Sequence, residues 1–427
     1  MIVTSTHRSC RECSGARSVD VRLVVSLRPP PNRRLCLAPM AGAPAHVVHP
    51  QPPTVSSRSG AARYSITPSW PPLSDRKVKV HLEPRPKRFS LAVVGCAVVL
   101  VATGCSAEAP EPTPVPNQRS EWFLPANPPR AFTAESWWNT PVPRDAPSHP
   151  RANAILDYMQ TGRQASDGCV RLAGAGKNEW GQPVYWSRPT DNAYDVAVDI
   201  PQPRPPELGG LRIPEGARAA ATSDAEMTIF DMDGGYVVAL TGADFDPRTD
   251  TWSARGATIT YLDSNGLHAR TGRSDVARNT GSHRGNNGAT MMVRHDEVTE
   301  GTIEHVLKVA SGPEASKRFV FPMIGSDGDS ENPDAPPQGL RFRIKPTVDL
   351  STPDLAPEAR VIAQALQTYG FYVGDSSGVT ALKLENTRAE GRGQLWELPS
   401  TALCSLPLRS DLWDVLPEGY EPSGSVG

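Results

Sequence analysis

Leu340-Arg341-Phe342-Arg343-Ile344-Lys345 is the stretch that decides the fold class of this chain. Its apolar and basic residues alternate strictly, which is the period of a β-strand. We expect the apolar face to pack on a core and the basic face to contact water. Strand-like runs of the same general kind occur at 194–200, 227–230, 236–240, 257–262 and 318–321.

Three helices are expected beside these strands. Two of them, at 150–161 and at about 357–369, have an apolar face and end at a glycine. The third, at 299–310, places Ile303 and Leu307 on one apolar stripe. Several strands with a few packed helices, and without regular alternation of the two, predict an α+β fold that is predominantly antiparallel and sandwich-like.

The segment KRFSLAVVGCAVVLVATGC, residues 87–105, has the layout of an export signal: two cations, an apolar run and small residues before Cys105. Its apolar run is short for a bilayer span, which needs about 20 apolar residues. The final Ala102-Thr103-Gly104-Cys105 resembles the lipobox of bacterial lipoproteins, which implies that Cys105 is lipidated. We therefore expect a lipid anchor on the extracytoplasmic side of the cell membrane. A plain secretory signal cut elsewhere and a buried apolar helix are the alternatives.

This signal divides the chain into four parts. We interpret residues 1–86 as a mis-annotated or disordered leader, because they are rich in Pro, Arg and Ser and have no apolar period. Residues 87–105 are the signal peptide. Residues 106–129 have few apolar side chains and predict a disordered, Pro-rich tether. The remainder, 130–420, is long enough for a single globular extracytoplasmic domain.

The charge balance changes when the leader is set aside. Residues 1–88 contain 15 of the 44 basic residues but 4 of the 46 acidic ones, which leaves 29 against 42 and a net charge of −13. An acidic domain lacks the electrostatic footprint of a nucleic-acid-binding protein. The expected partners are therefore the membrane, through the lipid, and a polysaccharide, but not nucleic acid.

Cys169 and Cys404 are the two cysteines that follow Cys105. Outside the membrane the environment is oxidising, which favours a disulfide between them. Such a bond would close a loop of more than two hundred residues, and the chain-entropy model gives long loops the largest stabilisation. Two buried free thiols are the alternative.

Asp231 begins the sequence Asp-Met-Asp-Gly-Gly, which joins two apolar runs. The sequence is typical of a hairpin turn. Asp231 could instead be a catalytic carboxylate at a strand end that faces a cleft, and a calcium loop is a third interpretation. The acidic turn at 326–332 could also hold calcium, but neither motif has the full ligand set of an EF-hand. No metal or other cofactor is expected.

Residues 278–288 form the longest polar, Gly-rich segment within the domain. Ordinary turn chemistry explains its Gly and Asn residues. A histidine, two arginines and several amides between apolar strands would also suit a site that binds an oxygen-rich ligand. His283 is therefore a candidate catalytic residue, and Asn286 and Asn287 are candidate ligand-binding residues. No Gly-Lys-Ser/Thr follows, which argues against a phosphate loop.

The next block, R-x-D-E-V-x-x-G-x-I-x-H-x-L at 294–307, contains Arg294, Asp296, Glu297 and His305. It is similar to a block of a broad group of secreted, largely uncharacterised bacterial proteins, often from actinobacteria and often attached to carbohydrate-binding modules. Four further stretches resemble the same group: 136–141, 336–343, 360–370 and 373–378. The last departs from the group's pattern, because a serine follows the aspartate where an asparagine is expected. The resemblance implies no agreed reaction.

These four residues are also candidate catalytic residues, although Asp296 and Glu297 could simply favour a helix N-terminus and His305 could be solvated. Glycan hydrolysis needs two carboxyl groups, about 5–5.5 Å apart for retention or roughly 6.5–9.5 Å for inversion. Asp231, Asp296 and Glu297 are the candidates for that pair.

A lyase would instead use a base, and His283 or Tyr261 are the candidates. Arg294 or Asn286 would then neutralise a uronate carboxylate.

Trp138 is the candidate sugar platform among five tryptophans in the first half of the domain, most of which we expect in the core. Motifs of serine hydrolases, zinc proteases and dinucleotide-binding enzymes are absent from the sequence. The expected function is a membrane-anchored carbohydrate-active enzyme, a hydrolase or lyase acting on cell-wall or environmental glycan. A non-catalytic envelope lipoprotein that binds glycan or a protein partner is the alternative, so whether the chain is an enzyme stays open.

Overall fold

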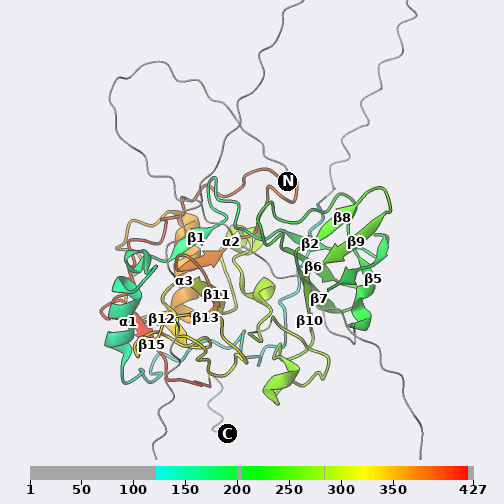
Figure 1. Cartoon of the computed structure of the whole chain (residues 1–427). Helices are drawn as coiled ribbons and strands as arrows, with labels where there is room; N and C mark the ends of the chain where they lie inside the picture. Colours follow the sequence, from blue (N-terminus) through cyan, green and yellow to red (C-terminus); the bar gives the residue numbers. More distant parts are fainter. Residues whose placement is uncertain (1–121, 200–203, 283, 422–427) are drawn as a thin grey trace, which may run out of the picture. The chain divides into compact units, whose positions relative to one another are not determined.

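The computed structural model of the chain describes residues 122–199, 204–282 and 284–421 (Figure 1). These residues all belong to the second of two compact units, Gly104–Gly427. The expected leader, signal peptide and lipidated Cys105 lie outside the described residues, as do most of the tether and the side chain of His283. Within the described ranges, no helix is both long enough and apolar enough to cross a membrane.

The described part contains three α-helices and fifteen strands. The helices are α1 (Ala152–Thr161), α2 (His295–Glu300) and α3 (Pro357–Thr368), and the 3-10 turns are η1 (Ser166–Gly168), η2 (Pro206–Leu208), η3 (Ala269–Thr271) and η4 (Gly288–Met291). The strands are β1 (Arg171–Ala173), β2 (Val184–Trp186), β3 (Ala193–Asp195), β4 (Ala197–Val198), β5 (Gly209–Arg212), β6 (Met227–Asp231), β7 (Tyr236–Thr241), β8 (Asp244–Asp246), β9 (Thr251–Ala254), β10 (Gly256–Tyr261), β11 (Leu307–Ser311), β12 (Arg341–Ile344), β13 (Phe371–Ser376), β14 (Ala381–Lys383) and β15 (Trp413–Val415).

A six-stranded mixed sheet has the order β1-β14-β11-β13-β12-β15. Its β1–β14 and β11–β13 pairs are parallel, and its remaining pairs are antiparallel. The largest apolar cluster packs on this sheet and includes side chains from α1 and α3, such as Leu156 and Ile362. Phe342 of β12 stacks on Phe371 of β13, with ring centroids 5.1 Å apart.

A second, four-stranded sheet has the order β10-β7-β6-β2 and its own apolar cluster, which includes Ile229 and Val238. A two-stranded sheet, β3-β5, and a three-stranded sheet, β4-β9-β8, contribute to the same cluster. Isolated bridges, Gln182 with Glu385 and Val293 with Leu384, link the segments that flank the two larger sheets.

The α+β fold class is confirmed. Strands dominate the described residues, and their antiparallel pairs outnumber the parallel ones. The expected helices at 150–161 and 357–369 correspond to α1 and α3, and the strand runs at 227–230, 236–240 and 257–262 correspond to β6, β7 and β10.

The disulfide between Cys169 and Cys404 is also present, with a Cα–Cα distance of 4.8 Å across a sequence separation of 235 residues. It ties the segment before β1 to the loop before β15. The predicted pairing of the two cysteines is therefore confirmed.

The helix predicted at 299–310 is wrong. Helix α2 ends at Glu300, because Gly301 adopts a left-handed conformation with φ of 85° and caps the helix C-terminus. The chain then enters β11, whose burial alternates from Leu307 to Ser311 with the period of a strand. Ile303 and Leu307 are buried as expected, but from a loop and a strand rather than from one helical face.

The solvent-facing side expected for β12 is also wrong, because Arg341 and Arg343 are each only 1% exposed. Arg341 donates hydrogen bonds to the carbonyl oxygens of Tyr369 (2.6 and 2.8 Å) and Thr140 (3.1 Å). Arg343 donates to the carbonyl of Pro143 (2.5 Å) and forms an ion pair with a neighbouring aspartate on β15. The segment before α1 covers the second face of the strand, and its backbone carbonyls accept hydrogen bonds from both guanidinium groups, although Nη1 of Arg341 has no partner among the described residues.

Two expected strands are not continuous. The run at 194–200 is divided into β3 and β4, with a register shift at Tyr194/Asp195 in the pairing of β3 with β5. The run at 318–321 contributes only an isolated bridge, between Phe319 and Gln338.

Candidate functional site

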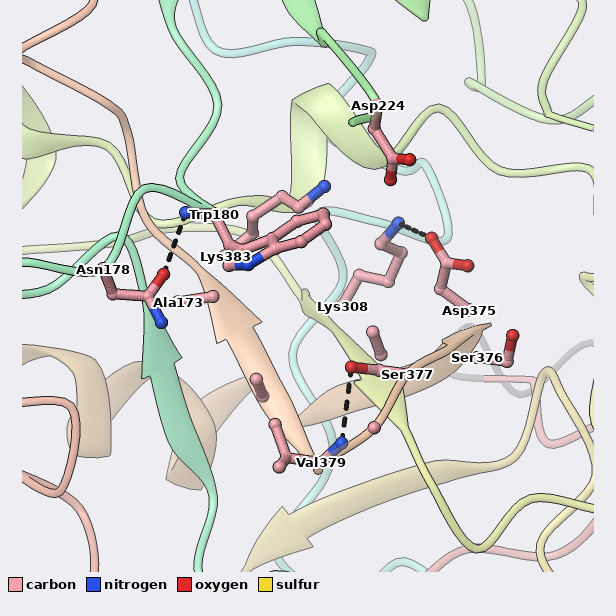
Figure 2. A pocket seen from close by; sticks show the side chains of 13 residues that line it. Ala173, Asn178, Trp180, Asp224, Lys308, Asp375, Ser376, Ser377, Val379 and Lys383 are labelled. Atoms are coloured by element: carbon pink, nitrogen blue, oxygen red, sulfur yellow. Dashed lines mark hydrogen bonds and ion pairs between the residues drawn. The ribbon is translucent and has the colours of Figure 1, made fainter. Parts of the chain in front are cut away.

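A pocket of about 560 Å³ lies over strands β1, β14, β11 and β13 of the six-stranded sheet (Figure 2). This volume falls within the roughly 300–1,000 Å³ that is usual for small-molecule sites. Its lining comes from segments far apart in the sequence: Ala173 of β1, the loop residues Asn178 and Trp180, Asp224 before β6, Lys308 and Ala310 of β11, the stretch 375–379, and Ala381 and Lys383 of β14.

Asp375, near the end of β13, lines this pocket. Its Oδ1 lies 2.6 Å from Nη2 of Arg284, and its Oδ2 accepts a hydrogen bond from Nζ of Lys308 at 3.3 Å. Gly374 permits this arrangement, because a Cβ at that position would lie 2.9 Å from Cγ of Lys308 and 3.1 Å from Nδ2 of Asn286. The parallel pairing of β11 with β13 thus brings a lysine and an aspartate together at the pocket wall.

Arg284 also binds Asp327, behind the pocket wall. Its Nε donates to Oδ1 of Asp327 at 2.9 Å, and Ser376 donates to Oδ2 of the same carboxylate at 2.9 Å. Burial alone would raise the pKa of Asp327, but the hydrogen bonds and positive charge of Arg284 outweigh burial and hold that pKa well below its ordinary value. The ion-paired Arg284 therefore connects the two aspartates.

Glu314 lies beside this network with no exposed surface. Its Oε2 accepts a hydrogen bond of 2.8 Å from Gln338, whose Nε2 also lies 2.5 Å from Oδ1 of Asp327. Among the described residues, Oε1 of Glu314 has no hydrogen-bond partner. Burial raises the pKa of Glu314 to about 9, and the nearby charges of Asp327 and Asp375 act in the same direction. Glu314 is accordingly a neutral, protonated carboxyl group at pH 7.

Trp180 is the exposed aromatic side chain of the pocket, with 46% of its surface accessible. Oδ1 of Asn178 accepts hydrogen bonds from the backbone N–H groups of Trp180 (2.8 Å) and Gly174 (3.1 Å), which fixes the turn that presents the indole. In Figure 2, Trp180 and Asp375 stand on opposite sides of the pocket. An accessible indole face opposite polar groups is an arrangement that can hold an amphipathic ring.

The charges of the pocket compensate one another. Two lysines and two aspartates contribute to the lining: Asp224, Lys308, Asp375 and Lys383. Lys308 is paired with Asp375, and Lys383 forms an ion pair with Glu226. A polyanion would therefore meet no excess of positive charge here.

A second, smaller hollow of about 210 Å³ lies next to the end of β13. Ser376 and Ser377 line both hollows. The remaining wall of the second hollow is polar, with Arg163, Gln164, Glu314, Asp327 and Asp329 alongside two glycines.

The residues of the 294–307 block do come together, but in a buried network that contributes to neither hollow. Arg294 lies 3.0 Å from Glu297 and 3.2 Å from Asp296, and Nε2 of His305 lies 3.1 Å from the Glu297 carboxylate. Burial would raise the pKa of Glu297, but Arg294 and His305 outweigh it and lower that pKa. The guanidinium of Arg294 also lies 5.6 Å from the ring centroid of Trp186.

Two further acids extend this buried network. Glu385 accepts a hydrogen bond of 2.6 Å from the backbone N–H of His295, and Glu390 accepts one of 2.7 Å from that of Val184. Arg392 bridges the two carboxyl groups at 2.5 and 2.9 Å. Burial raises the pKa of Glu385, and burial together with the charge of Glu385 raises the pKa of Glu390. These contacts join α2 to β2 and the segment after β14, which is a structural role.

Asp231 is the last residue of β6, where the hairpin turn to β7 begins, and it pairs with Tyr236 of β7. It is fully buried, and its Oδ1 accepts a hydrogen bond of 2.9 Å from the backbone N–H of Gly234. Tyr261, the alternative base, donates to Glu207 at 2.6 Å. Burial and that contact raise the pKa of Tyr261 to about 12, which leaves it protonated at neutral pH.

The three candidate ligand-binding residues are all buried. Asn286 donates to the carbonyl of Gly374 at 2.9 Å, and Asn287 donates to Thr260 at 3.0 Å. Trp138 is 2% exposed and packs edge-on against Tyr372, so its faces are not open to a sugar ring.

In the acidic turn at 326–332, the carboxylate of Asp327 binds Arg284. Across the described ranges, no group of three or more His, Cys, Asp or Glu side chains is arranged to hold a metal ion.

The charged pocket residues that the sequence did not single out are Asp224, Lys308 and Lys383. Lys308 falls inside the segment predicted as a helix, where its neighbours in the fold could not be deduced. Asp375 does belong to one of the resembling stretches, 373–378, and this was the available signal. Comparison with protein-family models, curated proteins and solved structures finds no match for the chain.

Proposed function

We propose that the chain is an exported lipoprotein, anchored through Cys105, whose domain acts on a cell-wall or environmental glycan at the pocket between Trp180 and Asp375. The single observation that carries this proposal is the pocket itself. It combines an accessible indole with two carboxyl groups and two ammonium groups. Trp provides an apolar face for a sugar ring, and the polar groups provide hydrogen bonds to its hydroxyls.

Hydrolysis is the reaction that these groups suit best. It requires one carboxyl group to protonate the leaving oxygen and a second to act as nucleophile or as base for water. Asp375, which contacts Arg284 and Lys308, is assigned to the second role. Asp224, which forms no ion pair with the described residues, is assigned to the first. A lyase is less well supported at this pocket, because Tyr261, one of its two candidate bases, contributes to neither hollow; His283, the other, lies outside the described residues.

A non-catalytic glycan-binding role is the second candidate, and one observation favours it. The Asp375 carboxylate already has two cationic partners, and such pairing reduces the nucleophilicity of a carboxylate. The pocket would then recognise the sugar by stacking and hydrogen bonding without cleaving it.

The test is incubation of the purified protein with a panel of wall and plant polysaccharides, followed by detection of new reducing ends. Asp375→Asn and Asp224→Asn should each lower turnover at least 100-fold, as expected for loss of an acid or base. Trp180→Ala should raise KM more than it lowers kcat, because it removes binding in ground and transition states alike. If the natural protein binds a polysaccharide without cleaving it, and Trp180→Ala abolishes this binding, the second candidate is favoured. If neither binding nor product is detected with any polysaccharide, the proposal is refuted.

The anchor is tested separately. We expect a clickable palmitate analogue to label the chain in its native host and the label to be lost in Cys105→Ala, with the protein moving from the membrane fraction to the soluble fraction. Unchanged membrane association of the variant would contradict the lipid anchor without affecting the glycan pocket.

A further inference from the structure

The two hollows meet at the end of β13. Ser376 and Ser377 line both of them, so the boundary between the hollows is formed by two small side chains. Ser376 is exposed, and Gly378, the residue after Ser377, has no side chain. A Cβ built on Gly378 would meet no atom within 4 Å. Gly378 lines the first hollow but not the second, so this open space lies in the first hollow, next to the boundary.

The volume of the smaller hollow suits an extension of a neighbouring site better than a separate ligand pocket. At about 210 Å³ it is below the roughly 300–1,000 Å³ typical of a stand-alone ligand pocket. It is large enough to extend a neighbouring site. Arg163 and Asp329 form an ion pair of 3.2 Å at its rim, and both side chains are more than half exposed. They offer a donor and an acceptor to a ligand that passes over the boundary.

The charge pattern indicates the kind of ligand. The first hollow pairs its cations with carboxylates, and the second pairs Arg163 with Asp329 and contains the neutral Glu314. Neither hollow has a surplus of cations that would favour a polyuronate or a nucleotide.

We infer that the two hollows are subsites of one groove that binds a neutral oligosaccharide across Ser376 and Ser377, with Asp375 beside the bond between the sugars. This inference rests on the proposed function and adds the substrate class: a chain of at least two uncharged sugar units. Binding of only a terminal unit would leave the second hollow unused.

The experiment measures affinity against ligand length by titration calorimetry with the intact chain in detergent. The probes are two series of neutral β-1,4-linked sugars, from monosaccharide to hexasaccharide: chito-oligosaccharides and cello-oligosaccharides. If both hollows are used, affinity should rise at least about tenfold from the monosaccharide to the length that fills the second hollow, and then level off. Turnover is followed in the same samples, and Asp375→Asn is used wherever product appears.

Variants show which hollow provides the increase in affinity with ligand length. Arg163→Ala should reduce affinity for the long sugars by about 2- to 10-fold, as expected for one polar contact, and leave the monosaccharide unchanged. Gly378→Trp should block both lengths, because it fills the open space at the boundary. Matched controls are Arg248→Ala, an exposed ion-paired arginine outside both hollows, and Gly256→Trp, a glycine whose Cβ also meets no atom within 4 Å.

The outcomes separate this inference from the proposed function. If the affinity is equal for all lengths and Trp180→Ala abolishes binding, the groove is refuted but the proposed glycan pocket is not. A length dependence that Arg163→Ala does not alter would also overturn the role of the second hollow. Failure of every probe to bind would count against both.

Discussion

Glu314 provides the sharpest test of the electrostatics around the pocket. Its carboxyl group has no exposed surface, and burial raises its pKa to about 9 from an ordinary value of 4.5. We predict that Glu314→Gln is more stable than the natural protein at neutral pH. Glutamine has nearly the shape of the protonated carboxyl and can still accept the hydrogen bond from Gln338.

The sign and size follow from proton linkage. Between pH 4.5 and about 9 the folded protein keeps a proton on Glu314 that the unfolded chain releases, so each unit of pH lowers the free energy of unfolding. One pKa unit corresponds to about 1.4 kcal/mol, and pH 7 lies about 2.5 units above the ordinary pKa. The penalty that glutamine removes at pH 7 is therefore on the order of 3 kcal/mol, and it should vanish near pH 4.5.

The assay is urea unfolding of both proteins, followed by far-UV circular dichroism at pH 4.5, 5.5, 7 and 8. The stability difference in favour of Glu314→Gln should grow steadily with pH. Glu300→Gln, at an exposed position on α2, is the matched control and should show little change. A stability difference between the two proteins that does not change with pH would refute the assignment of Glu314 as a buried neutral acid.

Three further predictions concern the framework. The double variant Cys169→Ser/Cys404→Ser should lose about 2–4 kcal/mol of unfolding free energy, and a reductant should lower the Tm of the natural protein to that of the variant, which is itself insensitive to reductant. Glu297→Ala leaves the buried Arg294 without its closest carboxylate, so we expect a loss of about 3–5 kcal/mol in urea unfolding, whereas a surface-like loss below 1 kcal/mol would contradict the buried network. Gly370→Ala should cost at least about 1–3 kcal/mol, because the residue has φ of 73° and a Cβ would lie 2.0 Å from a backbone carbonyl oxygen of β12; an unchanged Tm would show that this contact is relieved.

The elements that could be predicted from the sequence are those whose pattern is local. Helix α3 has its apolar face, its first-turn proline and a following glycine within one stretch, and β6 and β7 are joined by a turn of standard chemistry. The helix expected at 299–310 failed for a physical reason. Gly301 ends α2. The residues that follow form a short apolar run, and the periodicity of so short a run does not separate a helix from a strand.

The charged residues of β12 show a different limit. Alternation of apolar and basic residues is the same whether the second face meets water or a covering segment. Arg341 and Arg343 are buried, and both donate hydrogen bonds to backbone carbonyls before α1, about 200 residues away in sequence. The sequence next to the strand therefore does not indicate that a distant segment covers it.

The candidate catalytic residues of the 294–307 block come together in a buried network. Arg294, Glu297 and His305 are close in sequence and mixed in charge, and such a group forms a compact network that satisfies itself and needs no ligand. A binding site needs the opposite: polar groups from different segments that converge on space which no side chain fills. Lys308 and Asp375 meet that condition only through the parallel pairing of β11 with β13, so the sequence could contain the residues without revealing that they share a pocket.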